Sequence, residues 1–183
     1  QLVILAGNHD SVSMLNESKD LLARLNTQVI SSVADSHTEQ VLVLKQRNGQ
    51  VGAIVCAIPY IRPRDVQRSQ AGQSGDEKQR DLQQAIAEHY AQLFAQAQAV
   101  RAELGLALPI IGTGHLTTVG VSLTESVREI YVGTLTAFPT DAFPAFDYLA
   151  MGHIHRPQKV AGLEHMRYSG SPIALSFDEG RQQ

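Results

Sequence analysis

Cysteine and tryptophan are almost absent from this 183-residue sequence, which has one cysteine, Cys56, and no tryptophan. A single cysteine excludes an intramolecular disulfide and a zinc cluster built from cysteines. Basic residues are not in excess either, since 15 Lys and Arg stand against 18 Asp and Glu and the formal net charge is −3. That balance excludes a protein that holds DNA by bulk positive charge alone, but not an enzyme that uses a few local cations. No apolar run reaches membrane-spanning length and no export signal opens the sequence, so we expect a cytoplasmic protein without membrane attachment.

Apolar residues are plentiful enough for a sizeable core, because 43% of the chain is hydrophobic and its length suits one domain. The chain begins, without an initiator Met, in the apolar run of residues 2–6, which is typical of a central strand buried on both faces. Such a strand needs a neighbour on each side, so a natural protein rarely starts there. We therefore expect residues 1–183 to be a single but partial domain, cut from a longer protein.

Helical periodicity marks two stretches. Residues 81–104 repeat apolar side chains at helical spacing and form the clearest predicted helix. A second helix is predicted to start at Ser13 or Asn16, either of which can cap it, and to end at Leu25. The predicted buried side of this second helix consists of Leu15, Leu21, Leu22 and Leu25.

Apolar runs between turn signals predict the strands. Residues 41–44 and 51–57 flank Asn48-Gly49, a pair typical of a type I′ hairpin turn, in which both central residues need positive φ. Prolines and a polar, glycine-containing composition predict loops at residues 59–64 and 69–77. Strands and helices alternate while some strands form hairpins, so the predicted fold is an α/β layer domain with a mixed sheet. Further strands are predicted at residues 2–6, 29–30, 109–112 and 148–152, with a closing hairpin of 160–162 and 165–168.

Three predicted strands end in a glycine that is followed by side chains able to bind metals. The segments are Gly7-Asn8-His9-Asp10, Gly112-Thr113-Gly114-His115 and Gly152-His153-Ile154-His155. Buried strands of an α/β sheet deliver the loops that follow them to one edge, so we expect one Asn and four His to meet at one rim. Neutral imidazole and an Asn carbonyl oxygen are ligands for ions such as Mn. Ordinary polar loop residues are the alternative that this pattern alone leaves open.

A pair of ions at such a rim would explain the pattern chemically. Two metals about 3.5–4 Å apart polarise a phosphate and supply a hydroxide for in-line attack. A neighbouring histidine that does not bind the ions can protonate the leaving oxygen.

The same three segments resemble the last three motifs of the calcineurin-like metallophosphoesterases. Their longer context is similar to the bacterial SbcD family of nuclease subunits, and the resemblance covers essentially the whole chain, most weakly over residues 69–108. It implies a calcineurin-like, mixed-sheet αββα sandwich that is incomplete at the N-terminus. It also implies a metal-dependent double-strand exonuclease and single-strand endonuclease in DNA repair and recombination, homodimeric and working with an SbcC-type ATPase. The segments that carry the resemblance are residues 5–11, 58–65, 112–120, 152–156 and 168–179.

The resemblance implies a role for each residue at the rim. His9 would contact the scissile phosphate and act as the acid, with Asp10 holding its ring. The family opens with Asp-x-His and Gly-Asp-x-x-Asp motifs, whose Asp bridges the ions, and both would precede Gln1. We therefore expect this chain to carry about half of the site and to be inactive alone; a C-terminal capping region is also expected beyond Gln183. The implied ligands are Asn8, His115 and His153 on one Mn ion and His155 on the other.

Some other features of the sequence keep two interpretations. Arg62 and Arg64 are candidate contacts for DNA phosphates, with a solvated basic loop as the alternative. Residues 168–172 are expected to form a turn that supports the metal loops, with a backbone that faces the phosphate as the alternative. Cys56 is expected to be a buried small hydrophobe. Two other functions compete with the nuclease: another calcineurin-like phosphodiesterase, and a non-catalytic scaffold or ATPase-docking piece. No role is assigned to His37, His89 and His165.

Overall fold

The computed structural model describes residues 1–67, 72–121, 137–174, 177 and 179. Its strands form a two-stranded sheet of order β1-β2 and a six-stranded sheet of order β3-β4-β5-β6-β8-β7. The two-stranded sheet consists of β1 (Leu2–Leu5) and β2 (Thr27–Ile30). The larger sheet consists of β3 (Val41–Lys45), β4 (Val51–Cys56), β5 (Ile110–His115), β6 (Tyr148–Gly152), β7 (Gln158–Val160) and β8 (Leu163–Tyr168).

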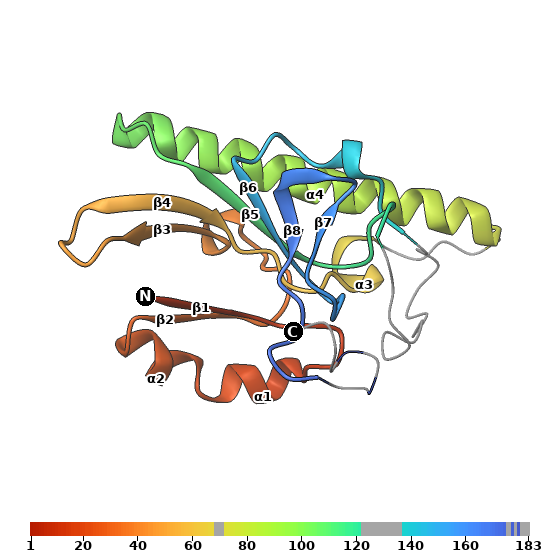
Figure 1. Cartoon of the computed structure of the whole chain (residues 1–183), viewed down its shortest axis with the longest axis horizontal. Coiled ribbons are helices and arrows are strands. Elements are labelled where there is room, and N and C mark those ends of the chain that lie inside the picture. Colours follow the sequence, from red (N-terminus) through yellow and green to blue (C-terminus); the bar gives the residue numbers. More distant parts are fainter. Residues whose placement is uncertain (68–71, 122–136, 175–176, 178, 180–183) are drawn as a thin grey trace.

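Helices cover both sides of this pair of sheets (Figure 1). The long helix α4 (Gly75–Leu104) lies on the outer face of the larger sheet, and α1 (Val12–Glu17) and α2 (Lys19–Arg24) lie beyond the smaller one. The layers follow one another as helix, sheet, sheet, helix. The predicted αββα sandwich with a mixed sheet is thus confirmed. The short elements are α3 (Pro63–Val66) and the 3₁₀ turns η1 (His37–Glu39) and η2 (Thr140–Ala142).

Strand β4 shows why the sandwich holds together, because both of its faces are buried. Ile54 and Cys56 belong to the core under α4, while Val55 and Ala57 pack between the two sheets with Ile30. This alternation is the period of two that a strand imposes on its side chains. The predicted burial of Cys56 is confirmed, and that burial raises the pKa of its thiol to about 12.

The first strand differs from its prediction. Within the described residues, β1 is hydrogen-bonded in parallel to β2 alone, and Leu2 is 55% exposed. The prediction of a central strand buried on both faces is therefore wrong. The apolar composition of β1 is explained by packing on one face only, where Val3 and Leu5 contact the core between the sheets.

The predicted helix ending at Leu25 is broken in two at Ser18. Its N-cap is Ser11, whose hydroxyl accepts from the Met14 backbone N–H, and not Ser13 or Asn16. Leu21 and Leu25 are 65% and 67% exposed, against the prediction. Both helices belong to the outermost layer, so only one side of them meets the protein. Leu15 and Leu22 are half-buried.

Helix α4 begins earlier than the apolar pattern predicts. Ser74 and Glu77 form a capping box, in which each side chain accepts from the backbone N–H of the other residue. The first turns are polar because they face solvent, so the apolar repeat begins only at Leu82. Residues 75–77 are thus helical and not part of a loop, and residues 69–71 of that predicted loop lie outside the described residues. The helix ends at Gly105, whose φ of 63° suits glycine.

The β3–β4 hairpin is confirmed, but its turn type is not. Gly49 has a φ of 85°, whereas Asn48 is not among the residues of positive φ, so the turn is not type I′. The Gly49 N–H donates to the Gln46 carbonyl at 3.0 Å, and the ladder register shifts between Leu44 and Lys45. A bulge therefore absorbs the extra residue of the turn.

The proline-rich loop also contains a short helix. Pro63 takes the first position of α3, where its missing N–H costs no hydrogen bond. The prediction of irregular structure is therefore wrong from residue 63 onward. The strands at 109–112 and 148–152 and the closing β7–β8 hairpin are confirmed. None of the described helices combines the length and apolar character that crossing a membrane requires.

Candidate metal centre

His115 and His153 lie side by side because they come from neighbouring parallel strands. His115 is the last residue of β5, and Gly152 is its partner at the end of β6. His153 follows directly, and the two ring centroids lie 5.2 Å apart. We predicted His115 in a loop after the strand. Instead β5 continues through Gly112 and Gly114, because its pairing with β6 extends to His115.

Asn8 reaches the same place from the smaller sheet. It follows β1, and its Oδ1 lies 2.8 Å from Nε2 of His115. An amide oxygen only accepts hydrogen bonds, so Nε2 of His115 donates here. Two of the predicted ligands, 107 residues apart in the chain, are therefore within hydrogen-bond distance.

Two glycines make room for the His115 ring. A Cβ on Gly7 would lie 2.7 Å from Cε1 of His115, and a Cβ on Gly152 would lie 3.0 Å from its Nδ1. Neither position tolerates a side chain unless the ring moves. His153 has a φ of 91°, a conformation rare outside glycine, and such strain persists only where the surrounding structure enforces it.

The imidazoles of His115 and His153 are held neutral. Burial lowers the pKa of His115 to about 4, with repulsion from His153 as the next cause and attraction to Asp10 opposing it. Burial also lowers the pKa of His153, and His155 and His9 add to the effect. His9 and His155 are therefore near enough for their charges to act on this pair. A neutral ring is the form that binds a metal.

His9 and Asp10 lie on the exposed side of the cluster. The carboxylate of Asp10 accepts from the Gly7 backbone N–H at 2.6 Å, which closes the turn after β1. Its predicted role in holding the ring of His9 stays a prediction.

Glu179 is a functional candidate that sequence reasoning missed. Its Oε1 lies 2.9 Å from Nδ1 of His155, and Glu179 is only 3% exposed. The signal available in the sequence was its place at the end of the segment 168–179, but no local pattern links it to a histidine 24 residues earlier. The turn after β8 contacts the same loop as predicted, since the Ser171 N–H donates to the His155 carbonyl at 2.8 Å.

The proline-rich segment borders the cluster through Tyr60 and Arg62. The Tyr60 ring meets His115 edge-on at 6.1 Å, and the Arg62 guanidinium lies 5.6 Å from the Tyr60 centroid. Nη2 of Arg62 donates to the Asp10 carbonyl at 3.2 Å, while its buried Nη1 has no partner among the described residues. Arg64 is different, because its side chain is 79% exposed and lies 3.8 Å from Asp65.

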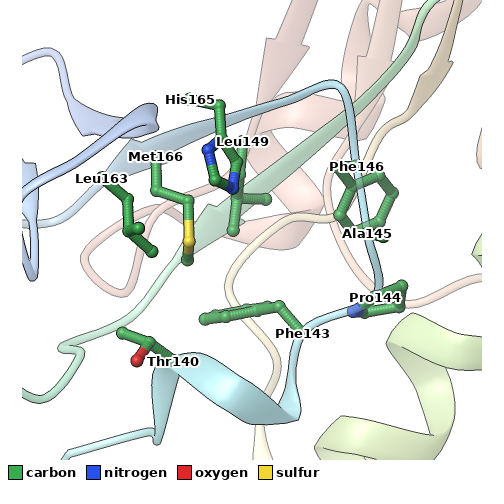
Figure 2. Close-up of a pocket in the computed structure, with 9 residues that line it drawn as sticks. All are labelled: Thr140, Phe143, Pro144, Ala145, Phe146, Leu149, Leu163, His165 and Met166. Carbon is green, nitrogen blue, oxygen red and sulfur yellow. The ribbon is translucent and has the colours of Figure 1, made fainter.

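Two cavities lie along β6. One of about 280 Å³ opens beside His115 and is also lined by Leu5, Tyr148 and Arg167. Another of about 170 Å³ is mainly apolar, and Figure 2 shows Phe143, Leu149 and Met166 among its lining side chains, with His165 at its edge. No candidate ligand lines this second cavity.

The donors present suit a manganese ion only in part. Asn8, His115 and His153 offer an amide oxygen and neutral nitrogens, which are acceptable ligands for such an ion. Within the described part of the chain, however, no three His, Cys, Asp or Glu side chains converge on a metal position. Two carboxylates in the described part of the chain are engaged with other groups, Asp10 with a backbone N–H and Glu179 with His155. Asn8, His115 and His153 thus supply neutral ligand atoms only.

No family model matches the chain. The curated SbcD subunit of the nuclease SbcCD from Escherichia coli (strain K12) is 56% identical over 178 residues, which are 97% of this chain and 43% of that protein. The SbcD subunits of Rhodobacter capsulatus and Bacillus subtilis are 32% and 29% identical over 98% and 97% of this chain, and each is covered to 44%. The chain thus spans less than half the length of the curated relatives it matches. Over nearly its whole length, the chain is thus similar to the SbcD subunits of SbcCD nucleases.

Proposed function

We propose that the protein is the nuclease subunit of an SbcCD-type complex, a metal-dependent DNA nuclease that acts with an SbcC-type ATPase. It would work as a double-strand exonuclease and single-strand endonuclease in repair and recombination. The observation that carries the proposal is the meeting of Asn8, His115 and His153 in a chain that is 56% identical to the SbcD subunit of a curated SbcCD nuclease.

In this proposal Asn8, His115 and His153 hold one Mn ion and His155 the other. Bound ions of this kind polarise a phosphate and lower the pKa of a water that attacks it. The chain's own residues bind and orient: the two sheets bring Asn8 and His115 together, and His9 gives a proton to the leaving oxygen. Asp10 would keep the ring of His9 in place.

Arg62 is the better supported of the two proposed DNA contacts. Its guanidinium is fixed by the Tyr60 ring and the Asp10 carbonyl, which places its positive charge next to the cluster. Arg64 would add a flexible charge at the surface. We expect Arg62→Ala to weaken duplex binding more than Arg64→Ala.

A second copy of the chain is the proposed neighbour of the outer helices. Met14, Leu21 and Leu25 are 74%, 65% and 67% exposed on α1 and α2 and at the end of α2. Large apolar side chains gathered on one outer layer mark interaction surfaces. We propose that this layer contributes to a homodimer.

The test of the metal function compares two lengths of the protein. We expect the 183-residue chain to bind at most one Mn ion weakly and to leave duplex ends intact, because two close cations need a carboxylate between them. A longer form with the family's two Asp-containing motifs should bind two ions and digest duplex ends. Calorimetric titration with Mn and a duplex-end digestion assay, both carried out on the two lengths, test this expectation. Tight binding of two ions and digestion by residues 1–183 alone would show that the ligands are misplaced.

Two variants of the longer form separate the roles. His153→Ala should lose Mn affinity and activity together, whereas His9→Ala should retain Mn and lose only activity. Loss of metal in His9→Ala would contradict its assignment as the acid.

A further inference from the structure

The ring of His155 is held by a carboxylate that no motif of the family resemblance assigned. Oε1 of Glu179 lies 2.9 Å from Nδ1 of His155, and Glu179 is almost fully withdrawn from solvent, at 3% exposure. A buried carboxylate is costly unless it is paired and hydrogen-bonded, so this contact is a requirement of the fold at that place.

The chemistry of the contact determines which nitrogen of His155 carries the proton. An ionised carboxylate has no hydrogen to give, so Nδ1 of His155 donates and Glu179 accepts. In a neutral ring the lone pair is then on Nε2. A histidine that binds a metal through one nitrogen commonly donates its other N–H to a carboxylate, which fixes the tautomer and the ring orientation.

The backbone of His155 is held as firmly as its ring. The Ser171 N–H donates to the His155 carbonyl at 2.8 Å, and a Cβ on Gly170 would lie 2.8 Å from that same oxygen. Two residues that follow β8 in the chain therefore contact His155. Ser171 bonds to its main chain, and Glu179 bonds to its side chain.

We propose that Glu179 is a positioning residue, which holds His155 in the Nδ1–H tautomer and presents its Nε2 to a divalent cation. The part of this proposal that concerns the cation rests on the proposed function. The part that concerns the tautomer and the ring orientation does not depend on it. Glu179 acts through His155 and is not itself a ligand.

The first test reads the tautomer in the metal-free 183-residue chain. Long-range ¹H–¹⁵N spectra of the labelled histidines, assigned with His155→Ala, should show His155 protonated on Nδ1. Glu179→Ala should shift the proton toward Nε2, and Glu179→Gln, whose amide oxygen still accepts, should restore Nδ1–H. Glu164→Ala removes a carboxylate that is paired with Lys159 at the surface, and it should change nothing at His155.

The second test reads metal affinity in the longer form by Mn calorimetry. Glu179→Ala should lower the binding affinity for one of the two Mn ions by about tenfold or more. Glu179→Gln should lower it by less. An Nε2–H tautomer in the unsubstituted chain would overturn the proposal even if Glu179→Ala does not fold. An Nδ1–H tautomer that depends on Glu179 in a protein that binds no Mn would instead overturn the metal function and leave the positioning of the ring intact.

Discussion

At the scale of single residues, His115 is the best determined side chain of the cluster. Asn8 contacts its Nε2, Tyr60 meets its ring edge-on, and the absence of a side chain at Gly7 and Gly152 leaves it space. Close packing of this kind leaves one position for the ring, so small changes around it have large effects.

Gly7→Ala should displace the His115 ring, because the new Cβ would lie 2.7 Å from Cε1. We expect the free energy of unfolding to fall by about 1–3 kcal/mol, as for other overpacked sites. Chemical denaturation measures it. Gly75→Ala is the matched control, since a Cβ there meets nothing within 4 Å and stands at a helix start, and it should be neutral. Equal effects of the two substitutions would contradict the steric argument.

His89 provides a residue-scale prediction about pH. Burial, followed by repulsion from His37, lowers its pKa to about 4, so it is neutral in the fold. Its Nε2 has no partner among the described residues, and a cavity of about 340 Å³ beside it is also lined by Asp35, Asp65 and Glu88. The unfolded chain, with a pKa near 6.5, takes up the proton first.

The contribution of neutral His89 to the free energy of unfolding should therefore be fully present above about pH 6.5. It should be lost as the pH falls toward 4. His89→Gln should flatten part of this slope in thermal unfolding followed across pH. His165→Gln, at an exposed histidine, should leave the slope as it was. An unchanged slope in His89→Gln would show that His89 is not protonated on unfolding in that range.

At the scale of elements, two tyrosines from different layers fasten β5 to its surroundings. Tyr90 of α4 donates from its hydroxyl to the Thr113 carbonyl at 3.0 Å. Tyr168 of β8 donates to the Leu116 carbonyl at 2.6 Å and accepts from the Thr118 N–H at 3.1 Å. The strand that ends in His115 is thus fixed just before and just after that residue.

Tyr168→Phe should loosen the segment after β5, because it leaves the buried Thr118 N–H without its acceptor. We expect a loss of about 1–3 kcal/mol in the free energy of unfolding and faster amide hydrogen exchange at Thr118. Tyr148→Phe, at a tyrosine 37% exposed on β6, is the control and should have little effect. Slow exchange at Thr118 in Tyr168→Phe would contradict the role of the hydroxyl.

At the scale of the whole molecule, the order of the layers determines which surfaces stay exposed and can contact a partner. The inner faces of both sheets and of α4 are used in the two cores. The outer layer formed by α1 and α2 (Figure 1) carries three of the exposed large apolar side chains, Met14, Leu21 and Leu25. This arrangement explains why Leu21 and Leu25, which were predicted as core, are found on the surface.

Leu21→Glu combined with Leu25→Glu should shift the protein from dimer to monomer in sedimentation or light scattering. Two carboxylates placed in an apolar contact are costly to desolvate. Leu163→Glu changes a leucine that is 39% exposed on β8 and should leave the mass unchanged. A wild-type chain that is monomeric at all concentrations would contradict the dimer.

The sequence by itself determined the features that depend on near neighbours. The β3–β4 hairpin, the end of α4 at Gly105 and the strands that lead to His115 and His153 follow from alternation, turn residues and periodicity. The meeting of Asn8 with His115 was also foreseen, because each lies at the end of an apolar strand with glycine nearby.

Tertiary structure decided what depends on residues far apart in the chain. Whether β1 is central or belongs to a two-stranded sheet depends on its partners, and apolar composition is the same in both cases. The exposure of Leu21 and Leu25 depends on how many layers cover the helix, which periodicity does not record. Glu179 reaches His155 only after β7 and β8 fold back between them, so no spacing rule predicts that contact. Local sequence sets what each segment can form, whereas burial and long-range pairing set which groups meet.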